Sequence, residues 1–166
     1  MKIDFTKKDE EFFKKNGFLI KKTNSAESID YLRKKIIDFI FLKKPKVKKK
    51  VKGKNIPIIL SNFHKLIKKN ELNDLRIFII NKLNKDKNFD KKYYLASKDI
   101  LEFLVGNELA MQTKINLSVQ IPNDQTSTLP MHSDIYAGES PFEVVCWIPL
   151  MDVKPNSQSM FITSPK

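Results

Sequence analysis

The chain has 166 residues, 41% hydrophobic and 30% charged, a composition that suits one soluble domain and excludes a disordered chain or a fibre. No apolar run approaches the length of about 20 residues that a membrane-spanning helix needs, and the lysine-rich start of the chain does not have the pattern of a secretion signal. The single Cys146 allows no internal disulfide, so we expect a cytoplasmic protein without a membrane partner.

The formal net charge of +12 is unevenly distributed. Residues 1–100 hold 28 Lys or Arg against 12 Asp or Glu, whereas residues 101–166 hold 3 against 7. A basic chain suggests an anionic partner, but the codon bias of an AT-rich genome enriches lysine without any functional selection. The charge alone therefore does not identify a partner.

The start of the chain predicts two helices. Thr6 and Asp9 have the spacing of a capping box, which predicts a short helix that ends at Gly17. Residues 18–20 are apolar and predict a short strand. A second helix is expected to open at Asn24, because apolar residues then recur at helical spacing. These apolar residues are Ile29, Leu32, Ile36, Phe39 and Ile40.

The middle of the chain predicts a polar loop followed by helices. Residues 43–54 hold eight lysines and one glycine, so an exposed loop is expected, with a phosphate-binding loop as the alternative. Apolar spacing predicts a helical segment over 61–83 with a break near Asn70. A further helix is expected over 96–105, where Gly106 ends it.

The last third of the chain changes from helical to strand periodicity. Apolar and polar residues alternate over 115–121, which predicts a strand with one apolar and one polar face. Further strands are expected over 131–135, over 142–150 and from Met160. Helices first and consecutive strands afterwards indicate an α+β fold with antiparallel strands.

His132 and Asp134 form a His-x-Asp motif. Residues i and i+2 of a strand point to the same face, so the imidazole and the carboxylate can converge on one metal ion. The motif is common by chance, but a strand with a polar face precedes it and an apolar strand containing Trp147 follows it. We therefore expect a metal site here, the alternative being a hydrogen-bonded pair in a loop.

With these motifs the chain resembles the non-haem Fe(II), 2-oxoglutarate-dependent oxygenases of the phytanoyl-CoA dioxygenase type. Within that group it is most similar to oxygenases of sporadically distributed carbohydrate-biosynthesis gene clusters. The resemblance implies a double-stranded β-helix, a jelly-roll or cupin-like barrel. Residues 1–110 would then be the mainly helical part of one incomplete domain, and residues 111–166 the first half of the barrel.

The same resemblance implies the cofactors Fe(II) and 2-oxoglutarate and the hydroxylation of a small metabolite, and the subgroup named above suggests a carbohydrate-related one. It implies that His132 and Asp134 are iron ligands and that Trp147 and Gln120 lie beside 2-oxoglutarate. Two imidazoles and one carboxylate on Fe(II) keep three positions free, two for the ketoacid and one for oxygen.

The family also has a distal histidine as third ligand and, shortly after it, an Arg or Lys that pairs with 2-oxoglutarate. In this chain the other histidine, His64, precedes the motif, and no Arg follows Phe161. We therefore expect a C-terminally truncated oxygenase that is inactive alone. A dimer or a complementing C-terminal chain would complete the barrel.

Two other classes of function remain open from the sequence. One is a cupin-like, metal-dependent isomerase or epimerase, because a fold does not fix a reaction. The other is a non-catalytic, nucleic-acid-binding protein that uses residues 43–54. That stretch has no aromatic residue to stack on bases, which makes a nucleic acid the less favoured partner. A requirement for 2-oxoglutarate would distinguish the oxygenase from the isomerase.

Overall fold

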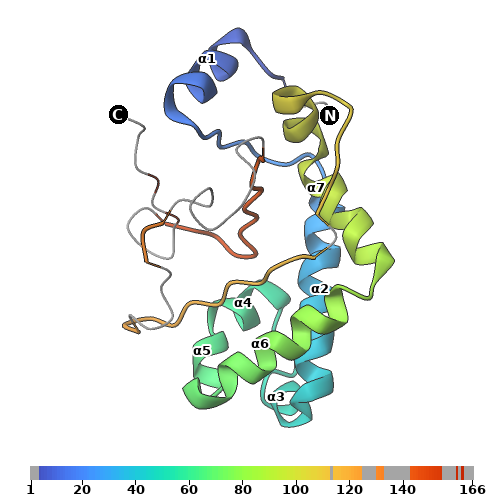
Figure 1. Cartoon of the computed structure of the whole chain (residues 1–166). Helices are drawn as coiled ribbons and strands as arrows, with labels where there is room; N and C mark the ends of the chain where they lie inside the picture. The colour runs from blue at the N-terminus through green and yellow to red at the C-terminus, as the bar shows by residue number, and fades with distance from the viewer. Residues whose placement is uncertain are drawn as a thin grey trace.

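The computed structural model describes residues 4–112, 114–124, 130–132, 143–154, 160 and 162. Its helices all lie between Lys7 and Val105 (Figure 1). In chain order they are α1 (Lys7–Asn16), α2 (Ala26–Lys43), α3 (Pro45–Lys50), α4 (Ile56–Ser61), α5 (Phe63–Leu66), α6 (Lys69–Leu83) and α7 (Lys87–Val105). None of these helices combines the length and the apolar character needed to cross a bilayer.

The expected α+β fold with a double-stranded β-helix is wrong for the part of the chain that the structure describes. That part is all-helical in its regular structure, and neither 18–20 nor the described residues of 111–166 form a strand. The alternation of apolar and polar residues predicts which side chains share a face. A sheet also needs a neighbouring strand to exchange N–H···O=C bonds, and this long-range requirement is not met among the described residues.

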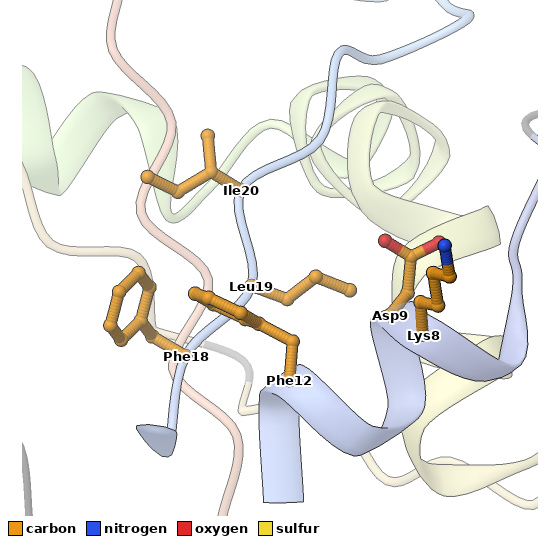
Figure 2. Close-up of a pocket in the computed structure, with 6 residues that line it drawn as sticks. All are labelled: Lys8, Asp9, Phe12, Phe18, Leu19 and Ile20. Atoms are coloured by element: carbon orange, nitrogen blue, oxygen red, sulfur yellow. The ribbon is translucent and has the colours of Figure 1, made fainter. Parts of the chain in front are cut away.

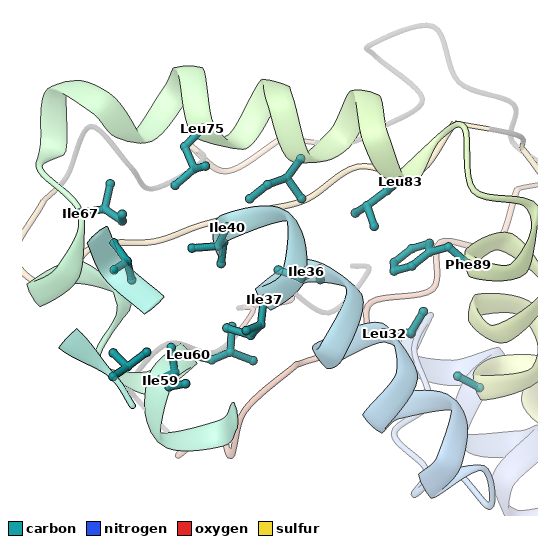
Figure 3. Packing of buried hydrophobic residues seen from close by; sticks show 14 residues of the cluster. Leu32, Ile36, Ile37, Ile40, Ile59, Leu60, Ile67, Leu75, Leu83 and Phe89 are labelled. Atoms are coloured by element: carbon teal, nitrogen blue, oxygen red, sulfur yellow. The ribbon is translucent and has the colours of Figure 1, made fainter. Parts of the chain in front are cut away.

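The hydrophobic core is organised around α2, which packs against α3, α4, α6 and α7. Its buried apolar side chains are Leu32, Ile36, Ile37 and Ile40. All but Ile37 belong to the face that the sequence predicts, and the other two predicted residues, Ile29 and Phe39, are partly buried against the core. Figure 3 shows side chains of α6, among them Leu75 and Leu83, directed toward this face. Phe89 and Ala96 extend the core onto α7. Burial of these side chains is the main force that holds the helices together.

Local capping signals predict α1 correctly and α2 less well. The Thr6 and Asp9 side chains form the expected capping box, and Gly17 ends α1 in the left-handed conformation at φ 76°. Asn24 does not cap α2, which begins after Ser25. The Asn24 amide instead donates to the Asp99 carboxylate on α7, 3.0 Å away, a contact that depends on the tertiary fold.

The expected exposed loop over 43–54 is wrong, because α3 occupies part of it. Pro45 lies in the first turn, and Val47 and Val51 are only 5% and 3% exposed, so two apolar side chains attach a lysine-rich helix to the core. The helical segment expected over 61–83 is divided, because α4 ends at Ser61, α5 spans Phe63–Leu66 and α6 begins at Lys69. The helix expected from residue 96 begins at Lys87 and ends at Gly106 as predicted.

Candidate functional site

Several polar contacts join the helices to the described residues beyond Gly106, and one of them is the ion pair of Lys69 with Asp124, 2.8 Å apart. The backbone N–H of Ile115 donates to Asn84 Oδ1 over 2.8 Å. Tyr93 Oη donates to the Cys146 carbonyl oxygen over 2.9 Å, and Arg33 Nε donates to the Leu150 carbonyl oxygen over 2.8 Å. Apolar side chains of the same segments pack on the core; they are Ile115, Leu117, Ile148, Leu150 and Met151. The helical layer therefore positions both segments that flank His132 in the sequence.

Each of these segments has an inner and an outer side. Around Gln120, the side chains of Val119 and Ile121 are partly buried while Gln120 is exposed. Around Trp147, Cys146 and Ile148 are partly buried while the indole is 44% exposed. Both side chains expected beside 2-oxoglutarate thus lie on the outer side of their segments, where a ligand can reach them.

The ring of His132 has a defined hydrogen bond. Its Nδ1 lies 2.7 Å from the Pro130 carbonyl oxygen, and the residue is exposed. Because a carbonyl oxygen only accepts hydrogen bonds, Nδ1 carries the proton, and in the neutral ring Nε2 holds the lone pair. Histidines that bind metals commonly have this arrangement, with the second ring nitrogen donating to a carbonyl or a carboxylate. His132 therefore fits the role of a metal ligand through Nε2.

The complete iron site implied by the resemblance is not found in the part of the chain that the structure describes. No group of three or more His, Cys, Asp or Glu side chains is arranged there to hold a metal ion. Asp134 lies outside the described residues, so its position relative to His132 is not defined. His64 lies on α5, beside a groove that lysines line.

Cys146 and Tyr93 form a partly buried polar contact between α7 and the segment 143–150. Burial raises the pKa of the Cys146 thiol, so this side chain stays protonated at neutral pH. Burial also raises the pKa of Tyr93 to about 12, so its hydroxyl remains a hydrogen-bond donor. These properties suit a structural contact rather than a nucleophile.

A hollow of about 360 Å³ lies between α1 and the segment that follows it (Figure 2). Its walls include Phe12 and Phe18, whose rings meet edge to face with centroids 5.3 Å apart. The Asp9 carboxylate on its border is bound to Lys21, 2.7 Å away, and to the backbone of Thr6. These contacts lower the pKa of Asp9, which makes its carboxyl group a cap and an ion-pair partner rather than a proton donor.

Comparisons with family models, with curated proteins and with solved structures found no match to the chain. The functional assignment therefore depends on the residues of the chain itself. Among the described residues, His132 has a ring hydrogen bond of the kind common in metal-binding histidines, and Gln120 and Trp147 are exposed on the outer sides of their segments.

Proposed function

We propose that this chain is part of an Fe(II)- and 2-oxoglutarate-dependent oxygenase that hydroxylates a small, carbohydrate-related metabolite, with His132 and Asp134 as two iron ligands. The observation that carries the proposal is the hydrogen bond from His132 Nδ1 to the Pro130 carbonyl oxygen, an arrangement that metal-binding histidines commonly have. Asp134 follows two residues later and supplies the carboxylate. The barrel implied by the resemblance is not part of this proposal.

The residues have complementary roles in the proposed site. Fe(II) supplies the redox chemistry together with 2-oxoglutarate, and the chain supplies binding and orientation. The Pro130 carbonyl fixes the His132 ring, which reduces the conformational freedom that metal binding must remove. The Gln120 amide can donate to a carboxylate of 2-oxoglutarate, and the Trp147 indole offers an apolar wall.

An anaerobic calorimetric titration with Fe(II) tests the first ligand. The two variants to compare are His132→Ala and His64→Ala, because the chain has two histidines and either change removes one imidazole. We expect the first variant to bind Fe(II) about tenfold more weakly or worse, and the second to bind like the parent chain. Equal losses in both variants, or no Fe(II) binding by the parent chain, would reject the assignment.

The carboxylate and the cosubstrate need separate experiments. Asp134→Asn should weaken Fe(II) binding, whereas Asp74→Asn, an exposed position on α6, should leave it unchanged although the charge change is the same. 2-Oxoglutarate should tighten Fe(II) binding by the parent chain, because two ligands that share a site are thermodynamically coupled. Metal binding at His132 that ignores 2-oxoglutarate would refute the oxygenase and favour a metal-dependent isomerase.

A further inference from the structure

Nearly all the excess positive charge of the chain comes from one stretch. Residues 43–70 contain eleven lysines and no Asp or Glu, in a chain whose net charge is +12. The stretch forms the end of α2, all of α3, α4 and α5, and the start of α6. Figure 1 places α3, α5 and the start of α6 at the end of the helical layer that lies away from α1. The fold thus gathers this charge at one end of the molecule.

A groove of about 840 Å³ opens at this end, a volume typical of small-molecule sites. One wall comes from the end of α2 and from α3, and its lysines are Lys43, Lys44, Lys46 and Lys50. The other wall comes from α5 and the start of α6, and its lysines are Lys65, Lys68 and Lys69. Two neighbouring segments of the sequence therefore supply lysines to one concave space.

Five of these seven lysines form no salt bridge in the part of the chain that the structure describes, although Lys68 lies close enough to Glu71 to lower the pKa of that carboxyl group. Lys44 pairs with Glu71 over 2.9 Å, and Lys69 pairs with Asp124 over 2.8 Å. Lys43 lies over the Phe78 ring, 5.1 Å from its centroid. No salt bridge to a described residue forms at the other four, which are Lys46, Lys50, Lys65 and Lys68. Like charges gathered in one groove repel one another, so a bound polyanion would stabilise the arrangement.

The chemistry of the groove favours phosphate groups. Lysine ammonium groups are compact, rotatable donors that bind phosphate as point charges. The groove lining contains no arginine, which would present a planar fork to a carboxylate, and no Phe, Tyr or Trp. Apart from the lysines, its polar side chains are His64 and Glu71, and the Glu71 carboxylate pairs with Lys44. Its floor includes the buried side chains of Val47 and Ile67. The first turn of α6, which has no side-chain cap at Lys68, adds to the positive potential.

We propose that this groove binds a small molecule through a diphosphate group, and that Lys50 and Lys65 contact that group from opposite walls. The proposal goes beyond the oxygenase function and does not depend on it. Lysines that form no salt bridge with a described residue lie on both walls and can surround a diphosphate together, whereas a single phosphate engages fewer of them.

A calorimetric titration with inorganic pyrophosphate tests the proposal on the full chain and two double variants. Lys50→Gln with Lys65→Gln removes one charge from each wall. Lys48→Gln with Lys49→Gln removes the same total charge from exposed positions of α3 that do not line the groove. We expect the first variant to bind pyrophosphate about tenfold more weakly, and the second to bind within about threefold of the parent chain. Circular dichroism checks that both variants fold.

The ligand series distinguishes the sources of the diphosphate group. Pyrophosphate should bind more tightly than orthophosphate. A nucleotide is the source of the diphosphate group if a nucleoside diphosphate binds at least as tightly as pyrophosphate and the double variant at Lys50 and Lys65 weakens both to the same extent. If pyrophosphate binds and the nucleoside diphosphate does not, a free diphosphate is the ligand. Equal losses in both variants, or equal affinity for orthophosphate, would overturn the proposal. So would the absence of pyrophosphate binding, including the case in which a single-stranded oligonucleotide binds instead.

Discussion

Asp86 connects the two longest helices, because its carboxylate caps α7 and pairs with α2. Its Oδ1 accepts from the backbone N–H groups of Asn88 and Phe89 over 3.1 and 3.2 Å, and its Oδ2 lies 3.0 Å from Lys35 Nζ. The side chains of Asp86 and Lys35 are 17% and 33% exposed. Loss of a helix cap costs about 1 kcal/mol, and loss of a partly exposed ion pair about 0.5 kcal/mol. We predict that Asp86→Ala lowers the free energy of unfolding by about 1.5 kcal/mol.

The assay is urea unfolding followed by circular dichroism. Asp86→Asn should lose less stability than Asp86→Ala, because asparagine also caps helices but cannot pair with Lys35. Asp74→Ala, at an exposed position of α6, is the control and should change the free energy of unfolding by less than about 0.5 kcal/mol. An effect of Asp86→Ala no larger than this control would refute the reasoning.

The effect should also depend on pH. Burial raises the pKa of Asp86, but the Lys35 ammonium and the N–H groups of Phe89 and Asn88 outweigh it and hold the pKa below the usual value of 3.8. The folded chain therefore binds this proton less readily than the unfolded chain, so the stabilisation is present above the unfolded pKa and is lost as the pH falls through the folded pKa. The difference in stability between the parent chain and Asp86→Ala should shrink on acidification. A constant difference would contradict the ionic contribution.

Three further predictions concern the core and the attachment of the segment 143–150. Leu75→Ala should lower the free energy of unfolding by about 3 kcal/mol, because Leu75 is only 1% exposed. The control Leu42→Ala, at a position 63% exposed, should change the free energy of unfolding little. Equal effects of the two variants in urea unfolding would contradict the packing of α6 on α2. Tyr93→Phe should cost about 1 kcal/mol and speed amide hydrogen exchange in 143–150, because it removes the bond to the Cys146 carbonyl oxygen. Burial raises the pKa of Tyr93 from 10.0 to about 12, so the unfolded chain loses this proton at a lower pH than the folded chain. The parent chain should therefore lose stability as the pH rises between these two values. Unchanged stability across this range would contradict the burial of the hydroxyl.

Signals within one or two helical turns predict the helices best. The Thr6 and Asp9 capping box, and Gly17 at the end of α1, were all identified because each acts over a few residues. The buried face of α2 follows from apolar spacing alone. The helix α3 was missed because its lysines suggest a loop, whereas two valines attach it to the core. Here the tertiary packing of a few side chains outweighs the local composition.

The candidate sites show the same limit. The His-x-Asp motif predicts His132 as a candidate ligand, but the contact of its Nδ1 with the Pro130 carbonyl oxygen depends on the path of the backbone. The lysines of 43–54 were noted as a charged stretch, whereas the facing wall with Lys65 and Lys68 was not foreseen. A groove between two segments is a product of their packing. The period of a sequence therefore predicts which side chains share a face, but not what lies opposite that face.

The central claim, that His132 binds a metal through Nε2, is tested most directly by nitrogen NMR of histidine-labelled chain. The two histidines, His64 and His132, give two sets of ring resonances, so each can be followed separately. Without metal, the neutral ring of His132 should be protonated at Nδ1, the atom 2.7 Å from the Pro130 carbonyl oxygen. Addition of Zn(II), a diamagnetic substitute for Fe(II), should shift Nε2 of His132 and leave His64 unchanged. A His132 ring that ignores the metal, or equal shifts at both histidines, would contradict the account.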